Sequence, residues 1–143
     1  MKLISHRGNI NGKDENLENN PVYIQEALAS GYDVEIDVWN YDGLWFLGHD
    51  KPEYAVNHEF LLNPSLWCHA KNITALREML FIGAHCFWHE TDKITLTSQG
   101  YMWTFPGEEL TDKSICVLPE TNDYIIGQCA GVCSDEISKY SNS

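Results

Sequence analysis

The spacing of apolar positions in the first half of the chain predicts strands that alternate with helices. Residues 2–5 form an apolar run and residues 32–39 alternate between polar and apolar, and both patterns predict strands. Between them, Asn20 and Pro21 are typical of a helix start, because asparagine caps free backbone N–H groups and proline fits the first helical position. Gly31 is typical of a helix end. The segment therefore predicts a strand–helix–strand unit.

A hairpin and a second unit of this kind follow. Residues 41–43 form a predicted turn that leads into the apolar segment 44–48. Residues 66–71 predict another strand, and the helix after it ends at Gly83. This order of strands and helices predicts a parallel sheet with right-handed crossover connections.

The pattern changes after Gly83, where short apolar segments are divided by turn residues and show no helical spacing. We expect short strands without crossover helices at residues 85–90, 94–97, 101–105, 115–118 and 126–133. A chain of 143 residues suits one domain, but it is short for an eight-stranded α/β barrel of about 200 residues or more. We place that domain at 1–137 and a frayed tail at 138–143.

Two acidic residues share one face of the predicted strand at 32–39. In an extended chain Glu35 and Asp37 project to the same side, whereas the valine and isoleucine residues between and beside them project into an apolar layer. Neighbouring carboxylates repel each other and cost desolvation unless a proton or a cation lies between them. Their oxygens suit Mg²⁺, Ca²⁺ or Mn²⁺, so we predict a metal site. The alternative is an edge strand whose two acids face water.

Overall charge and composition narrow the range of partners. The formal net charge of −12 argues against binding nucleic acid or an anionic membrane through general electrostatics. No apolar run approaches membrane-spanning length and residues 1–6 have no leader pattern, so we expect a cytoplasmic protein without membrane insertion. The five cysteines lie mostly in apolar runs without C-x-x-C spacing, which favours reduced core thiols over disulfides or a metal cluster.

Four short motifs follow one another between Leu3 and Asp50. They are His6-Arg7-Gly8 at the end of the first strand, Glu18-Asn19 before the first helix, Glu35-x-Asp37 on the second strand and His49-Asp50 after the hairpin. In order and spacing they resemble the glycerophosphodiester phosphodiesterase family, a (β/α)8-barrel group related to the phosphatidylinositol-specific phospholipases C. The resemblance implies an α/β fold that is a shortened TIM-barrel-like (β/α) fold, with helices mainly in the first half and short β-strands in the second. Its site would lie at the carboxyl ends of the strands.

The resemblance also implies roles for the matched side chains. His6 and His49 match the pair of histidines that act as general base and general acid across the phosphodiester, which suits an imidazole that titrates near neutral pH. Arg7 matches the arginine that binds phosphate oxygens. The alternatives are histidines with only a structural role and an arginine in an ordinary ion pair.

Metal ligands follow from the same resemblance. Glu35 and Asp37 match two of the family's ligands, and Glu18 matches a carboxylate in or beside the metal's shell. A third strand in the family reads Glu-x-Lys, and the corresponding strand here carries His69 and Lys71, so that histidine replaces the glutamate. We therefore expect His69 as a ligand and Lys71 as a phosphate-binding cation. The cofactor would be Mg²⁺, Ca²⁺ or Mn²⁺, and the imidazole leaves a transition metal open.

Later segments resemble the family more weakly. Residues 131–135 resemble its last barrel strand and residues 101–104 the one before it, which would place the missing length in the middle of the barrel. His89 and Glu120, at the ends of other predicted strands, are candidates to reach the site, with a place on a polar rim as the alternative. No role follows for His85.

The implied function is a metal-dependent phosphodiesterase that hydrolyses a small glycerol- or sugar-type phosphodiester. A substrate hydroxyl would attack phosphorus, and water would then open the cyclic phosphate that results. Two alternatives stay open, a non-catalytic phosphate-binding module and a lyase that releases the cyclic phosphate. Sheet edges and flanks without helices also lead us to expect a homodimer formed through the second half of the chain.

Overall fold

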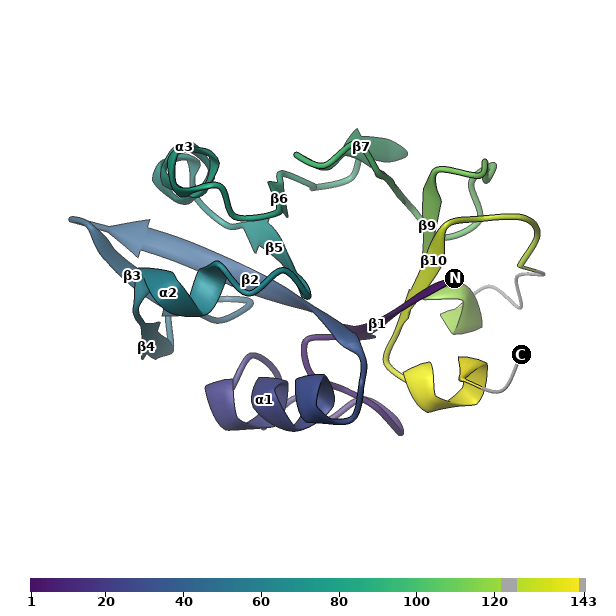
Figure 1. Ribbon diagram of the computed structural model, residues 1–143, viewed down its shortest axis with the longest axis horizontal. Coiled ribbons are helices and arrows are strands. Elements are labelled where there is room, and N and C mark those ends of the chain that lie inside the picture. Colours follow the sequence, from purple (N-terminus) through teal and green to yellow (C-terminus); the bar gives the residue numbers. More distant parts are fainter. Residues whose placement is uncertain (122–125, 142–143) are drawn as a thin grey trace.

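The computed structural model describes residues 1–121 and 126–141 as a curled, mixed β-sheet with helices along its outer side (Figure 1). Its elements in chain order are β1 (Lys2–His6), α1 (Pro21–Ala29), β2 (Asp33–Tyr41), β3 (Leu44–Leu47), β4 (Tyr54–Val56), α2 (His58–Leu61), β5 (Leu66–Ala70), α3 (Ile73–Ile82), β6 (Cys86–Phe87), β7 (Ile94–Leu96), β8 (Met102–Thr104), β9 (Ser114–Val117), the 3₁₀ helix η1 (Pro119–Thr121), β10 (Gly131–Ser134) and the 3₁₀ helix η2 (Ile137–Tyr140).

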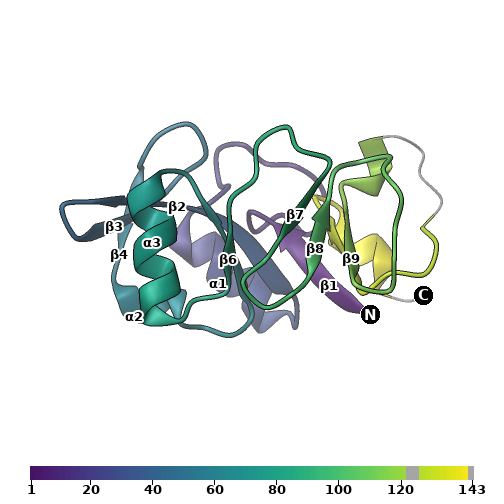
Figure 2. The same cartoon turned by 90° about the horizontal axis from the view of Figure 1, so that it is seen from above.

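Parallel pairing dominates the sheet. The strands β6, β5, β2, β1, β10, β9 and β8 run parallel in that spatial order. Three antiparallel pairs complete the sheet. β7 pairs with β8 at one end, β3 pairs with β2, and β4 pairs with β3. Seen from above, α3 lies beside β6, and β7 lies beside β8 (Figure 2). β1 lies between β2 and β10, so the first strand of the chain pairs with the last one.

The expected TIM-barrel-like (β/α) fold is wrong. The strands form a half-barrel, and within the described residues the α-helices are only the short α1, α2 and α3. A barrel of parallel strands joins each strand to the next by a crossover helix, which takes a dozen residues or more. After Gly83 the connections 88–93 and 105–113 contain no helix, and β7 runs antiparallel to β8. A ring of alternating strands and helices therefore does not form.

The central strand β2 has two different faces because helices cover only one of them. Val34, Ile36 and Val38 are fully buried against α1 and α3. Glu35 and Asp37 alternate with them along the strand and so project from the opposite, inner face. β2 is hydrogen-bonded to β1, β3 and β5, so the alternative of an edge strand with acids facing water is wrong.

Aromatic side chains fill the inner side of the curled sheet. Trp67, Phe87 and Trp103 form a buried cluster together with Ile4 and Ile115. The ring centroids of Phe87 and Trp103 are 4.6 Å apart, and those of Trp67 and Trp103 are 5.8 Å apart. Their volume lets a few residues from short strands fill the interior, so the sheet curls around a packed core.

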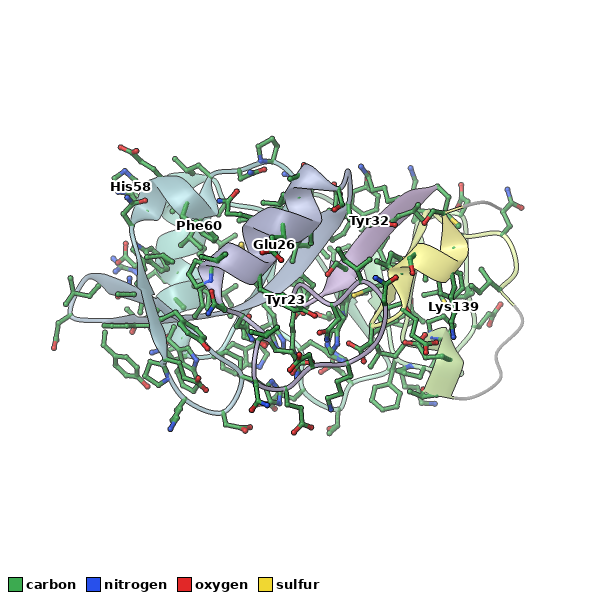
Figure 3. All side chains as sticks on the ribbon, turned by 90° about the horizontal axis from the view of Figure 1, so that it is seen from below. Tyr23, Glu26, Tyr32, His58, Phe60 and Lys139 are labelled. Carbon is green, nitrogen blue, oxygen red and sulfur yellow. The ribbon has the colours of Figure 1, made fainter. Side chains whose placement is uncertain are left out.

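The helix ends follow the local sequence. The side chain of Asn20 accepts a hydrogen bond from the backbone N–H of Val22, and Pro21 is the first residue of α1. The side chain of Asn72 caps α3 in the same way, and Gly83 ends α3 in the left-handed conformation with φ of 83°. The underside of the molecule shows α1 across the sheet, with Tyr23 and Glu26 on it (Figure 3).

The C-terminal segment packs back on the sheet. η2 lies against β1 and β10, and Lys139 marks it on the underside (Figure 3). Residues 138–140 of the expected tail belong to η2. Asn142 and Ser143, at the end of that tail, lie outside the described residues.

All five cysteines are free thiols, as the sequence predicts. Burial keeps them protonated, and it raises the pKa of Cys116 to about 12, with smaller effects from Cys129 and Glu120. Within residues 1–121 and 126–141, no helix has both the length and the apolar character needed to cross a membrane.

His85 is a buried imidazole in the inner core. Its Nε2 atom lies 2.8 Å from Oγ1 of Thr97, and its ring centroid lies 4.3 Å from that of Trp67. Burial, with a smaller effect from Lys2, lowers the pKa of His85 from 6.5 to about 4. As the pH falls below 6.5, the unfolded chain therefore binds a proton before the folded protein does, and the folded state loses stability.

We expect this residue to lower the free energy of unfolding by up to about 3 kcal/mol as the pH falls from 6.5 to 4. The variant His85→Gln keeps a polar group opposite Thr97 but cannot titrate, so it should lose this part of the pH dependence. Urea denaturation of both proteins at pH 7 and pH 4.5 measures the difference. His58→Gln, a change at an exposed histidine, should behave like the unchanged protein. The same acid-induced loss in the unchanged protein and in His85→Gln would contradict the assignment.

Candidate functional site

The candidate site lies at the carboxyl ends of β1 and β5 and beside the middle of β2, where the strand register brings side chains together. His6 on β1 is in register with Glu35 on β2, and Asp37 on β2 is in register with His69 on β5. Residues in register on neighbouring parallel strands project from the same face of the sheet. All four side chains therefore meet on the inner face of the half-barrel.

Glu35, Asp37 and His69 form a cluster with the composition of a metal site. Nδ1 of His69 lies 3.3 Å from Oδ1 of Asp37 and 3.7 Å from Oε2 of Glu35. One ligand atom from each residue can be chosen so that all three lie within 4.8 Å of one another. Oε1 of Glu35 and Oδ1 of Asp37 are buried and have no hydrogen-bond partner among the described residues. Buried oxygens without hydrogen bonds cost free energy unless positive charge lies beside them, and a divalent ion in place of the His69 proton would supply that charge to both carboxylates.

The orientation of His69 also fits a metal ligand. Its Nε2–H group donates a hydrogen bond to the backbone carbonyl oxygen of His89, with an N···O distance of 2.8 Å. This bond holds the ring so that Nδ1 faces Glu35 and Asp37. A fixed second nitrogen of this kind is the usual companion of a histidine ligand, because it sets both the tautomer and the ring direction.

Attraction outweighs the cost of burying charge in this cluster. Burial raises the pKa of Asp37, but His49, His69 and Arg7 lower it, and the result lies well below the usual range. Burial lowers the pKa of His69, but Asp37 and Glu35 raise it to about 9. At neutral pH His69 therefore holds a proton that a metal ion would have to displace.

His6 is held by a network of polar side chains. Its Nδ1–H group donates to Oδ1 of Asp135 over 2.7 Å, and its Nε2 atom lies 3.8 Å from Oε1 of Glu35. Asn9 donates both to Asp135 over 2.9 Å and to Glu18 over 2.7 Å, which fixes the two carboxylates. Burial lowers the pKa of His6, but the bond to Asp135 and the charge of Glu35 raise it above its ordinary value. The imidazole thus has one nitrogen anchored and the other directed into the site.

Arg7 connects the two halves of the site. Its Nε atom lies 3.2 Å from Oδ2 of Asp37, and Nη1 lies 3.3 Å from Oε1 of Glu18. The backbone turns sharply here, with φ of 60° at Arg7 and 98° at Gly8. A Cβ atom at Gly8 would lie 2.5 Å from the ring of Tyr23, so only glycine fits. The His-Arg-Gly sequence therefore serves the local backbone as well as the chemistry.

His49 reaches the site from the loop after β3. Its Nδ1 atom lies 3.5 Å from Oδ2 of Asp37, and its Nε2 atom lies 3.5 Å from Nη2 of Arg7. The side chain is 43% exposed, which leaves it room to contact a substrate. Asn19 supports the same carboxylate, because its side-chain N–H donates to Oδ2 of Asp37 and its oxygen accepts from the Asp37 backbone, both over 2.9 Å.

The structure brings together all the residues that the sequence singles out for the site. A cavity of about 430 Å³ contacts both histidines, Arg7, the metal-site residues Glu35 and His69, and Lys71, while Glu18 lines the cavity beside it. Of the further candidates, His89 lines the first cavity. Glu120 instead accepts hydrogen bonds from Ser134 and from the backbone of Asp135, and His85 lies in the core. The fold thus places the predicted site residues close together, and the catalytic roles of these residues stay predictions.

Three polar residues of the site are missing from the sequence-based set. Asp135 anchors His6, Asn9 joins Asp135 to Glu18, and Asn19 holds Asp37. The signal for Asp135 is its position directly after the last strand, β10. Asn19 belongs to the Glu18-Asn19 motif, although no role follows for it there, and Asn9 has a weaker signal because it lies in a polar loop where asparagine is common.

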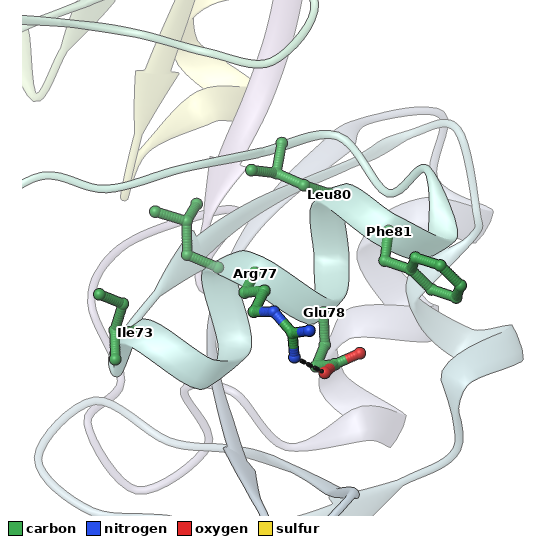
Figure 4. A pocket seen from close by; sticks show the side chains of 6 residues that line it. Ile73, Arg77, Glu78, Leu80 and Phe81 are labelled. Carbon is green, nitrogen blue, oxygen red and sulfur yellow. Dashed lines mark hydrogen bonds and ion pairs between the residues drawn. The ribbon is translucent and has the colours of Figure 1, made fainter.

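A separate depression on the outer side of α3 holds no comparable chemistry. It has a volume of about 670 Å³ and is lined by Ile73, Leu76, Arg77, Glu78, Leu80 and Phe81 (Figure 4). Its two charged residues pair with each other at 2.9 Å. Its exposed apolar side chains lie on α3, before Gly83, so the depression does not bear on the homodimer expected through the second half of the chain, which stays a prediction.

Comparisons of the chain with models of protein families, with curated proteins and with solved structures found no match. The resemblance to the glycerophosphodiester phosphodiesterases therefore rests on the four motifs, and the geometry of the side chains that they contribute supports a proposal about function.

Proposed function

We propose that this protein is a metal-dependent phosphodiesterase that hydrolyses a small glycerol- or sugar-type phosphodiester. One observation carries the proposal. Two buried carboxylate oxygens, Oε1 of Glu35 and Oδ1 of Asp37, lack hydrogen-bond partners among the described residues. The first lies 3.8 Å from Nε2 of His6 and the second 3.3 Å from Nδ1 of His69, and His49 lies on the other side of Asp37. A cation-binding cluster next to a pair of imidazoles is the set of groups that this reaction needs.

Glu35, Asp37 and His69 would hold the ion, with Glu18 further away in the network around Arg7. When bound, a divalent ion supplies positive charge that polarises the phosphoryl group and offsets the charge that develops on its oxygens. Oxygen ligands favour Mg²⁺, Ca²⁺ or Mn²⁺, and the imidazole leaves a transition metal open.

The two histidines would divide the proton transfers between them. One of His6 and His49 takes the proton of a substrate hydroxyl whose oxygen attacks phosphorus, and the other gives a proton to the oxygen of the departing alcohol. The product is a cyclic phosphate, and water opens it while the histidines exchange roles. Arg7 and Lys71 would bind the non-bridging phosphate oxygens, which carry negative charge throughout the reaction.

The test is cleavage of glycerophosphodiesters, whose glycerol supplies the attacking hydroxyl, by the purified protein with Mg²⁺, Mn²⁺ or Ca²⁺. We expect cleavage that stops when the metal is chelated. Phosphorus NMR of the glycerophosphodiester reactions separates the alternatives, because a hydrolase yields a phosphomonoester and a lyase leaves the cyclic phosphate. If no diester is cleaved with any ion while a diester analogue still binds, the non-catalytic module is the correct interpretation.

A further inference from the structure

Two cavities meet at the proposed acid–base pair. The residues that line both of them are His6, Arg7, His49, Leu118 and Thr121. A phosphorus atom between the two histidines would therefore lie at the junction, with one alcohol of the diester extending into each cavity. The linings of the two cavities differ, so the cavities favour chemically different alcohols.

The first cavity, which we call the apolar arm, has a volume of about 430 Å³ and a wall of apolar side chains. This wall consists of Trp103, Phe105, Pro106, Val117 and Leu118. Trp103 is buried and belongs to the inner aromatic core, whereas Phe105 is 42% exposed. Glu35, with its unpartnered oxygen, lines the same cavity. An aromatic wall of this size beside the reacting centre suits a planar apolar group.

The second cavity, which we call the acidic arm, has a volume of about 670 Å³ and a polar, negatively charged lining. Besides the junction residues it is lined by Lys13, Glu15, Asn16, Glu18, Asn19, Asp50, Glu53 and Asp135. Lys13 is already paired with Glu15 at 3.2 Å. No cation of the described residues lies within ion-pair distance of Glu53, and Asp50 has only the imidazole of His49, at 3.7 Å. This lining favours hydroxyl groups or a cation and repels a second anion.

We propose that the substrate is an asymmetric phosphodiester, with a planar apolar alcohol in the apolar arm and a polyhydroxylated, non-anionic alcohol in the acidic arm. This proposal rests on the proposed function and adds to it which alcohol leaves. A hydroxyl of the polyhydroxylated alcohol gives its proton to one histidine and forms the new P–O bond. The P–O bond to the apolar alcohol breaks, and the other histidine protonates the oxygen that departs.

The apolar arm is tested with two diesters of glycerol phosphate whose second alcohol is 2-phenylethanol or ethanol. These alcohols have similar acidity, so a difference in kcat/KM reports binding of the phenyl ring. We expect about tenfold or more in favour of the phenylethyl diester. Phe105→Ala should remove most of this preference, and Phe81→Ala, at a phenylalanine that is 86% exposed on α3, should not change it. Phe105→Leu serves as a second variant, and thermal melting checks that each variant is folded.

The acidic arm is tested by replacing glycerol with glycerate, which adds a carboxylate to the polyhydroxylated side. The anionic diester should be cleaved at least about tenfold more slowly, and Glu53→Lys should narrow that difference. Glu59→Lys, at an exposed glutamate of α2, should not narrow it.

Equal rates for the phenylethyl and ethyl diesters, or equal effects of Phe105→Ala and Phe81→Ala, would overturn the apolar arm and leave the phosphodiesterase intact. An unchanged rate for the glycerate diester would overturn the acidic arm. If neither glycerol diester is cleaved with any ion, both the function and this extension are wrong.

Discussion

Replacing either His6 or His49 by asparagine should lower the rate of diester cleavage by about 10²- to 10⁴-fold, the range for one positioned general acid or base. Each imidazole is directed into the site by a different anchor. Asp135 holds His6, while Arg7 and Asp37 flank His49. Asparagine keeps polar contacts with these anchors but cannot transfer a proton, so the loss should appear in kcat more than in KM.

The double variant of His6 and His49 should be little slower than the slower single variant, because groups that act as a unit show strongly non-additive losses. The control is His58→Asn, at an exposed histidine at the start of α2, which should keep the full rate. The rate of the unchanged protein should show a bell-shaped pH dependence, since one histidine must be protonated and the other neutral. Full activity in either single variant would remove that histidine from the mechanism.

Local features of the fold could be predicted because residues close in the chain determine them. Asn20 and Pro21 start α1, and Gly83 ends α3, each for a reason that a short stretch of sequence contains. β4 (Tyr54–Val56) and α2 (His58–Leu61) could not be predicted in this way. They are three and four residues long, which is too short for a periodic pattern.

The architecture was harder to predict because it depends on how strands far apart in the chain connect. The sequence lacks helical spacing after Gly83, and the expectation of a barrel came from the motifs before Asp50. β8 and β9 do run parallel, but residues 105–113 join them without a helix. A few motifs can indicate the chemistry at one edge of a sheet without determining whether the sheet closes into a barrel.

In the candidate site, too, features set by neighbouring residues could be predicted and contacts between distant residues could not. Glu35 and Asp37 could be recognised because they alternate with buried residues on one strand. The contact between Asp135 and His6 joins residues 129 positions apart, so it depends on the pairing of β10 with β1. Sequence spacing carries no signal for a contact at that range, although a polar residue just after a buried strand is a reasonable place to look.

A divalent ion should stabilise the protein against thermal unfolding. An ion that binds only the folded state adds about 2.7 kcal/mol when its concentration is a hundred times the dissociation constant. The double variant Glu35→Gln with Asp37→Asn should lose the increase in melting temperature, because it removes both buried anionic ligands. Glu59→Gln with Asp42→Asn neutralises two exposed acids and should retain it. Differential scanning calorimetry with and without chelator measures the melting temperature of all three proteins.

Stabilisation by the divalent ion should increase as the pH rises, because His69 must lose a proton when the ion binds. The raised pKa of about 9 means that this histidine stabilises the ion-free fold fully below pH 6.5, and that this contribution is lost as the pH rises to about 9. An ion must displace that proton, so its affinity should increase by up to about tenfold per pH unit below pH 9. Calorimetric titration at pH 6.5 and pH 8, in buffers of different ionisation enthalpy, should also detect one proton released per ion. An affinity that does not change with pH, or a double variant of Glu35 and Asp37 that is still stabilised, would show that the ion binds elsewhere.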